Sequence, residues 1–75
     1  LQNLQAEQYQ TARRELEVAV RLNDRSSDAR TNLGLACYYL GDDPCAIEQY
    51  RRAIELMPDN WQAHYNLGSL YDRQG

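Results

Sequence analysis

The sequence repeats itself with a fixed period. The triplet Asn32-Leu33-Gly34 recurs as Asn66-Leu67-Gly68, 34 residues further along the chain. The same spacing relates other small or apolar residues, namely Ala12 and Ala46, Ala19 and Ala53, and Leu22 and Leu56. A period of roughly 20–50 residues is typical of stacked units, each of which buries its apolar side against the next. Because such arrays mainly present a surface, we expect the chain to bind a partner and not to be an enzyme.

The apolar spacing within the period predicts helices. Between residues 27 and 41, apolar side chains follow one helical face: Ala29, Leu33, Ala36, Cys37 and Leu40. Similar spacing predicts further helices over residues 9–22, 44–57 and 61–74. The residues expected to face inward from these helices include Val20, Leu22, Ala46, Tyr50, Leu67 and Leu70. Because the connections are short, successive helices should pack antiparallel.

Residues that start and stop helices stand at the predicted boundaries. Ser26 or Ser27 suits the cap of the helix over residues 27–41, because a hydroxyl can accept a hydrogen bond from a free backbone N–H. Gly41 can end that helix in a left-handed conformation. Asp43 suits the cap of the next helix, with Pro44 in the first helical position.

The first residues are compatible with two structures. Glu7 stands one period before Gly41, and residues 1–10 contain no helix breaker. The segment can therefore turn, as the later unit does, or continue as one helix to residue 22. We expect the turn, so that part of one helix precedes the helix over residues 9–22.

Several residues agree in order and spacing between residues 27 and 60: Leu33, Gly34, Cys37, Ala46, Tyr50, Ala53 and Pro58. This arrangement resembles a tetratricopeptide repeat, in which Leu-Gly, an aromatic, Ala, an aromatic, Ala and Pro follow one another. The chain departs from that pattern in three places. Cys37 replaces an aromatic residue, Arg30 stands where the family often has Trp, and Asp24 stands one period before Pro58. We expect looser packing there, and not a different fold.

The resemblance implies an all-α fold of antiparallel helix-turn-helix repeats, stacked as an α-solenoid of about four to five helices. Residues 1–75 would form a single domain of this type. It would consist of a partial repeat over residues 1–26, a full repeat over residues 27–60 and the first helix of another over residues 61–75. Because the pattern begins and ends out of phase, we expect a piece of a longer protein.

The resemblance also implies where a partner binds. In this family, the first helix of each repeat lines a concave groove with the side that faces away from the second helix. The corresponding residues here are Thr31, Asn32, Leu35, Tyr38, Tyr39, Tyr65, Asn66, Ser69, Asp72 and Arg73. Exposed aromatic side chains are typical anchors of binding surfaces. Two alternatives remain: Tyr38 or Tyr39 could pack against a neighbouring helix, and Asn32 and Asn66 could brace the helices instead of binding a peptide.

The predicted groove residues indicate the chemistry of a partner. One subset of the family binds C-terminal carboxylates through Lys, Arg and Asn side chains. This chain has no Lys, and Arg73 is the one cation that we expect in the groove. We therefore expect a protein or peptide partner that is polar-aromatic or mildly basic. The alternative is a homo-oligomer, because Leu67, Leu70 and Tyr71 of the last helix lack a following helix to cover them.

Composition and motifs argue against other classes of function. The net charge is −3, with eight Arg and no Lys, so we expect no nucleic-acid partner. No apolar run is long enough for membrane insertion. We expect no metal, because Cys37, Cys45 and His64 lack metal-ligand spacing, and no cofactor or catalytic motif is present.

The two cysteines lie on opposite arms of one predicted hairpin, so a disulfide between them would be sterically reasonable. We expect free thiols, with Cys37 as a small apolar core residue, because intracellular disulfides are rare. The compartment stays open from the sequence, with the cytoplasm favoured.

Overall fold

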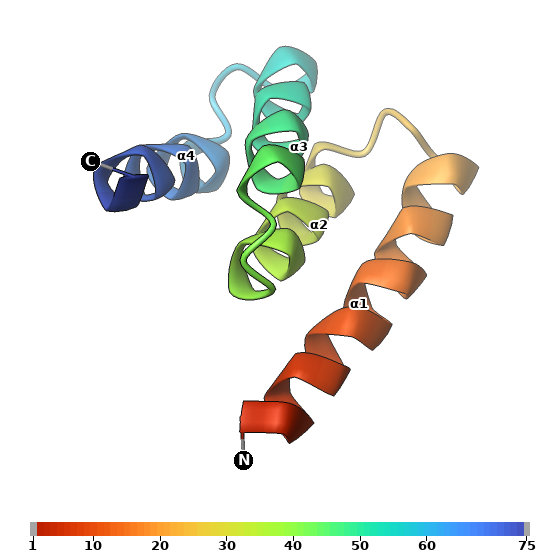
Figure 1. Cartoon of the computed structure of the whole chain (residues 1–75). Coiled ribbons are helices and arrows are strands. Elements are labelled where there is room, and N and C mark those ends of the chain that lie inside the picture. Colours follow the sequence, from red (N-terminus) through yellow and green to blue (C-terminus); the bar gives the residue numbers. More distant parts are fainter. Residues whose placement is uncertain (1, 75) are drawn as a thin grey trace.

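The computed structural model describes residues 2–74, with side chains from residue 6 onward, and contains four α-helices (Figure 1). The helices are α1 (Gln2–Leu22), α2 (Ser27–Tyr39), α3 (Asp43–Leu56) and α4 (Trp61–Gln74). Successive helices run antiparallel, and α2 contacts each of the other three. The all-α fold of helix-turn-helix repeats predicted from the sequence is thereby confirmed.

Helix α1 is continuous, so the prediction of a turn near Glu7 was wrong. The equivalent turn of the next unit depends on Gly41, whose φ is 80°. Glutamate adopts this left-handed conformation at a steric cost that glycine avoids. Residues 2–10 contain no Gly or Pro, and each residue added to a helix gains a backbone hydrogen bond. The helix therefore continues through the segment.

The turn between α2 and α3 is built around Gly41. The backbone N–H groups of Gly41 and Asp42 donate to the carbonyls of Tyr38 and Cys37, at 3.1 and 2.9 Å. This pair of bonds is typical of a helix that ends in a left-handed glycine, as predicted. The cap of α3 is Asp42 and not Asp43 as expected, because the carboxylate of Asp42 accepts the hydrogen bond from the first turn. Asp43 becomes the first residue of α3, which leaves its carboxylate free to contact α4.

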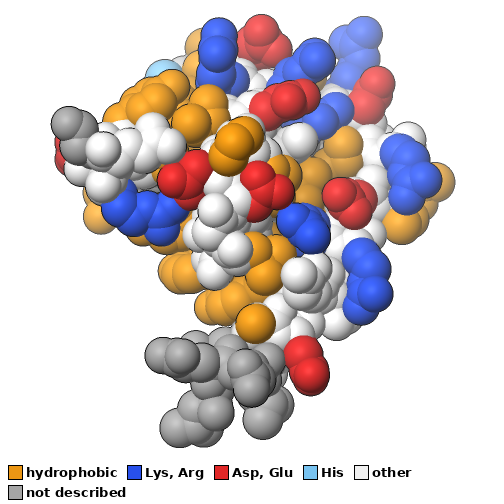
Figure 2. All heavy atoms as spheres, viewed as in Figure 1, with side chains coloured by type: hydrophobic (Ala, Val, Ile, Leu, Met, Phe, Trp, Pro, Cys, Tyr) orange, Lys and Arg blue, Asp and Glu red, His pale blue; other side chains and the backbone are white. Residues whose placement is uncertain are grey.

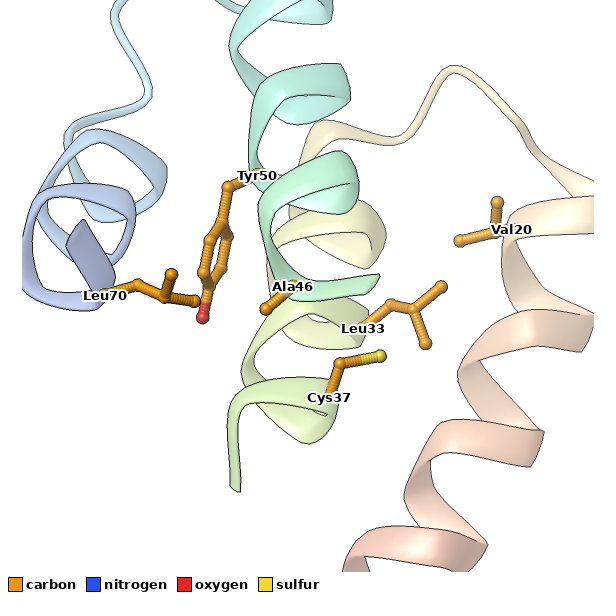
Figure 3. Packing of buried hydrophobic residues seen from close by; sticks show 6 residues of the cluster. All are labelled: Val20, Leu33, Cys37, Ala46, Tyr50 and Leu70. Atoms are coloured by element: carbon orange, nitrogen blue, oxygen red, sulfur yellow. The ribbon is translucent and has the colours of Figure 1, made fainter. Parts of the chain in front are cut away.

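The core lies on both sides of α2 (Figure 3). On one side, the fully buried ring of Tyr50 lies against Gly34. On the other side, Leu33 extends toward Val20 of α1 (Figure 3). The buried cluster consists of residues predicted to face inward: Val20, Leu33, Cys37, Ala46, Tyr50 and Leu70. Leu22, which was also expected to face inward, is 83% exposed at the end of α1.

Contacts one period apart join successive units in different ways. Tyr9 of α1 stacks on Tyr39 of α2, with ring centroids 4.7 Å apart. The equivalent positions one period later are Asp43 and Arg73, which form an ion pair between α3 and α4. Each contact ties the second helix of one unit to the last turn of the first helix of the next. The same pair of positions therefore holds an aromatic stack in one layer and opposite charges in the other.

A disulfide joins Cys37 to Cys45 across the hairpin of α2 and α3. Their Cα atoms are 5.9 Å apart, within the usual range for such a bond. The expectation of free thiols was therefore wrong. Cys37 is fully buried, whereas Cys45 is half-buried.

Reduction of this disulfide should lower the free energy of unfolding by about 2–3 kcal/mol, because a cross-link restricts the unfolded chain. Thermal unfolding with and without a phosphine reductant, followed by circular dichroism, measures the effect. Cys45→Ala removes the bond and leaves the buried Cys37 in place. This variant should match the reduced chain and respond no further to reductant. A melting temperature that is the same in both conditions would contradict the prediction.

Candidate functional site

Two adjoining hollows lie between α2 and α4. The first, here called the tyrosine hollow, has a volume of about 200 Å³ and is lined by Leu35, Tyr38, Tyr39, Tyr50, Tyr65, Asn66 and Ser69. The second, here called the amide hollow, has a volume of about 340 Å³ and is lined by Thr31, Asn32, Leu35, Tyr39, Trp61, Gln62, Tyr65 and Asn66. Four residues line both hollows, and the two together are called the groove below.

Eight of the ten site residues predicted from the sequence line the groove. Asp72 and Arg73 are the exceptions. Asp72 is exposed and lines neither hollow. The guanidinium of Arg73 pairs with Asp43 and lies over the ring of Tyr38, 4.1 Å from its centroid. The cation expected in the groove is thus engaged in contacts within the chain.

Aromatic rings of the groove are open to solvent. Trp61 is 71% exposed, Tyr65 is 68% exposed and Tyr39 is 54% exposed. Tyr39 both packs against a neighbouring helix and faces the groove, because it stacks on Tyr9 yet stays more than half exposed. Exposed rings gathered around a hollow are typical of a surface that binds another molecule.

The amide side chains of the groove are not committed to the fold. Asn32 is exposed and Asn66 is half-buried. Neither side-chain amide has a hydrogen-bond partner among residues 6–74. Each amide can offer both a donor and an acceptor to a bound molecule.

Thr31 has a different role from the other lining residues. Its side chain is buried, and its hydroxyl donates to the carbonyl of Ser27 at 2.9 Å. The same hydroxyl accepts a hydrogen bond from the side-chain amide of Asn60 at 2.9 Å. Thr31 therefore shapes the wall of the groove, while its hydroxyl serves contacts within the fold.

Three lining residues are not among the ten site residues predicted from the sequence, namely Trp61, Gln62 and Tyr50. Trp61 begins α4 and precedes Tyr65 by one helical turn, a spacing that places both on one face. Tyr50 belongs to α3 and was assigned to the core alone. Its ring reaches the tyrosine hollow beside Gly34, where a side chain on α2 would block it. Trp61 had a signal in the sequence, whereas the double role of Tyr50 follows from the packing.

The hydroxyl of Tyr50 is buried and has no hydrogen-bond partner in the part of the chain that the structure describes. Burial raises the pKa of Tyr50 from 10.0 to about 12. Tyr38 and Tyr39 add to this rise in pKa, and Arg73 opposes it. The phenol is therefore neutral at physiological pH, with an unused donor and acceptor beside the tyrosine hollow.

The raised pKa of Tyr50 predicts a loss of stability in base. The folded chain holds the phenolic proton of Tyr50 more tightly than the unfolded chain does. The resulting contribution to the free energy of unfolding is complete below pH 10.0 and falls as the pH rises toward about 12. Tyr50→Phe keeps the ring and should remove this component of the pH dependence. Near neutral pH the variant should stay within about 1 kcal/mol of the parent, because the deleted hydroxyl has no partner. Urea unfolding of both proteins across this range measures the effect, and parallel curves would contradict it.

The outer face of α3 is a weaker candidate. It bears a hollow of about 500 Å³ lined by Pro44, Ile47, Glu48, Arg51, Arg52 and Glu55, all from this one helix. Figure 2 shows acidic and basic side chains interspersed on one face of the molecule. Interspersed charges of this kind are typical of a solvated helix face, and no aromatic ring lines the hollow.

The helices over residues 2–74 do not include one long and apolar enough to cross a membrane. Within the same residues, His, Cys, Asp and Glu side chains form no group of three or more suited to a metal ion.

The sequence matches the pattern of a known family and two curated relatives. The TPR repeat pattern covers residues 34–75. Photosystem I assembly protein Ycf3 of Synechococcus sp. is 33% identical over 70 residues, which cover 89% of this chain and 40% of that protein. TPR repeat-containing protein MJ1428 of Methanocaldococcus jannaschii is 35% identical over 69 residues, which cover 92% of this chain and 12% of that protein. The chain thus spans less than half the length of either relative. Because the family pattern covers more than half of the chain and the fold agrees with it, the chain belongs to the TPR repeat family.

Proposed function

We propose that the groove binds a segment of a partner protein and that the chain acts as a noncatalytic interaction module. One observation carries the proposal: exposed aromatic rings from α2 and α4 surround two connected hollows whose amides have no partners in the described residues. Family membership supports it, because TPR modules are generally protein-interaction domains. One relative is named as an assembly protein, which accords with action on other proteins.

The chemistry of the groove suits a peptide segment. Tyrosine and tryptophan rings give a large contact area with few rotatable bonds, so little side-chain entropy is lost on binding. A peptide that leaves water must also replace the hydrogen bonds of its backbone. The free amides of Asn32 and Asn66 can supply both donors and acceptors for that purpose.

Selection of binders from a random displayed-peptide library, with the 75-residue chain as bait, tests the proposal. The affinity of a selected peptide would then be measured for the Tyr39→Ala, Tyr65→Ala double variant. We expect a loss of about tenfold or more, because aromatic anchors commonly contribute over 1 kcal/mol each. Glu48→Ala with Arg52→Ala, on the outer face of α3, provides a matched double variant that should leave the affinity unchanged.

Equal affinity for the groove variant and the parent would overturn the assignment of the groove. So would a loss of affinity that occurs only in the α3 variant. Circular dichroism of both variants must first show the helical signal of the parent, so that a loss of binding reflects the surface and not the fold.

A second candidate function is self-assembly through the side of α4 that bears Gly68 and Tyr71. Gly68 has open space where a Cβ would project, and Tyr71 is 49% exposed. A second copy could cover these residues. Sedimentation at decreasing concentration distinguishes the two functions. A dimer that resists dilution in the parent and dissociates in Tyr71→Ser would favour self-assembly, whereas a monomer throughout would favour the groove.

A further inference from the structure

Four of the six tyrosines of the chain line the tyrosine hollow, which has a volume of about 200 Å³. Leu35, Asn66 and Ser69 complete its lining, and no charged side chain takes part. We propose that this hollow receives the guanidinium of an arginine side chain from the bound segment. The inference rests on the proposed function and specifies the residue type that the groove selects.

The electrostatics of the hollow favour a cation. The face of an aromatic ring carries partial negative charge and attracts a guanidinium within about 6 Å of its centroid. The chain already shows this preference, since the guanidinium of Arg73 lies 4.1 Å from the centroid of the Tyr38 ring. Asp43 neutralises the charge of Arg73, so Arg73 repels the guanidinium of a bound arginine only weakly.

An anionic side chain would be poorly matched to the same hollow. No Arg or Lys lines it, and the chain as a whole carries a net charge of −3. The nearest cation, Arg73, is already paired with Asp43, so a carboxylate that left water for this site would be poorly compensated, which is costly. Charge complementarity therefore favours binding of an arginine of the partner over an aspartate or a glutamate.

The hydrogen-bonding groups of the hollow suit a guanidinium, which has five donors and no acceptor. The amide oxygen of Asn66 and the hydroxyl oxygen of Ser69 offer acceptors on the lining of the hollow. The hydroxyl of Tyr50 is fully buried and is not reached from solvent. A planar, weakly hydrated guanidinium also stacks on aromatic faces better than the compact ammonium of lysine.

The size of the tyrosine hollow suits one side chain. Its volume of about 200 Å³ is by itself smaller than the roughly 300–1,000 Å³ that sites for small molecules commonly enclose. The adjoining amide hollow provides room for the neighbouring residues of the same peptide.

The test uses the 75-residue chain and three short glycine-flanked peptides with blocked ends. Their central residue is arginine, its neutral isostere citrulline, or glutamate. Titrations are followed by the backbone amide resonances of isotope-labelled chain. We expect the arginine peptide to bind at least about fivefold more tightly than the citrulline peptide, with the largest shifts at Tyr65, Asn66 and Ser69. The glutamate peptide should bind most weakly.

A pair of tyrosine variants on α4 controls for the fold. Tyr65→Leu removes a ring of the hollow that is 68% exposed and should abolish the preference for arginine over citrulline. Tyr71→Leu removes a ring that is 49% exposed and lines neither hollow, so the preference should persist. Equal binding of the arginine and citrulline peptides to the parent would overturn the inference, as would an equal effect of the two variants.

These outcomes are separable from failure of the proposed function. If library-selected peptides lose affinity in the Tyr39→Ala, Tyr65→Ala variant but bind equally well with citrulline in place of arginine, the groove assignment stands and this inference falls. If selected peptides are unaffected by that variant, the groove assignment itself falls.

Discussion

Gly34→Ala should destabilise the chain by about 2 kcal/mol, whereas Gly68→Ala, the same substitution one period later, should stabilise it by about 0.5–1 kcal/mol. Both glycines lie within helices, so alanine gains about 1 kcal/mol of helix propensity at either position. The difference between the two outcomes comes from what each new methyl group meets.

At Gly34 a Cβ would lie 2.6 Å from Cε1 and 2.8 Å from Cδ1 of Tyr50. The ring is fully buried, and Figure 3 shows it extending from α3 toward Leu70 of α4. Because the ring is fully buried, it has little room to yield to the new methyl group, and overpacking of this kind costs about 1–3 kcal/mol. The severity of the contact places Gly34 at the upper end, which exceeds the gain in helix propensity. At Gly68 the new methyl group would meet no atom within 4 Å apart from its chain neighbours and the backbone of its own helix.

Urea unfolding of the two variants and the parent, followed by circular dichroism, measures both effects. A double-mutant cycle identifies the cause: in a Tyr50→Leu background, most of the cost of Gly34→Ala should disappear. A cost that persists without the ring would refute the steric explanation. Destabilisation by Gly68→Ala would instead show that its side of α4 is covered in solution, as the self-assembly alternative requires.

The helices between residues 27 and 74 could be predicted because independent signals agree there. The apolar period, the left-handed Gly41 and the position of Pro44 all indicate the same boundaries within one or two residues. Residues 1–10 carry no breaker, so the choice between a turn and a continuous helix depended on a small free-energy difference that the pattern does not reveal. The Cys37–Cys45 disulfide depended on the distance across the hairpin. Such bonds are more common in oxidising compartments, so the favoured cytoplasmic location stays a prediction that the fold does not support.

The candidate site was predictable where it follows helical spacing alone. Asn32, Leu35 and Tyr39 lie on one face of α2, and that face lines the groove. Contacts between elements modify the rest. Arg73 pairs with Asp43 and lies over the ring of Tyr38, so it lines neither hollow although it lies beside one. Side chains that contact two elements at once are therefore the part of the site that helical periodicity alone does not predict.

Asn60 is such a residue, and Asn60→Asp should destabilise the chain by about 3 kcal/mol although the two side chains have nearly the same shape. Asn60 is buried where the end of α3, the start of α2 and the start of α4 meet. Its side-chain oxygen accepts from the backbone N–H of Ala63 at 3.1 Å and so caps α4. Its amide nitrogen donates to the hydroxyls of Ser27 and Thr31, at 2.7 and 2.9 Å.

The hydroxyls of Ser27 and Thr31 cannot reorient to donate to a carboxylate at residue 60 without losing other hydrogen bonds. Ser27 donates its hydrogen to the carbonyl of Ala53, and Thr31 donates its hydrogen to the carbonyl of Ser27, both at 2.9 Å. Only lone pairs therefore face Asn60, and a carboxylate in its place would bring negative charge against both of them. Rotation of either hydroxyl toward the carboxylate would break a buried bond to a backbone carbonyl.

Ser26 provides the matched control, because it caps α2 one period earlier by accepting from the backbone N–H of Ala29 at 3.1 Å. Ser26→Asp should change the free energy of unfolding by less than about 0.5 kcal/mol, since Ser and Asp are nearly equivalent caps. Asn60→Ala should cost about 2 kcal/mol, less than Asn60→Asp, because it removes the cap and two donors but introduces no buried charge. If Asn60→Asp proved as mild as Ser26→Asp in urea unfolding, the cap alone would account for Asn60. A larger loss for Asn60→Asp than for Asn60→Ala would show that the buried hydroxyl pair at the junction of α2, α3 and α4 requires a hydrogen-bond donor at residue 60.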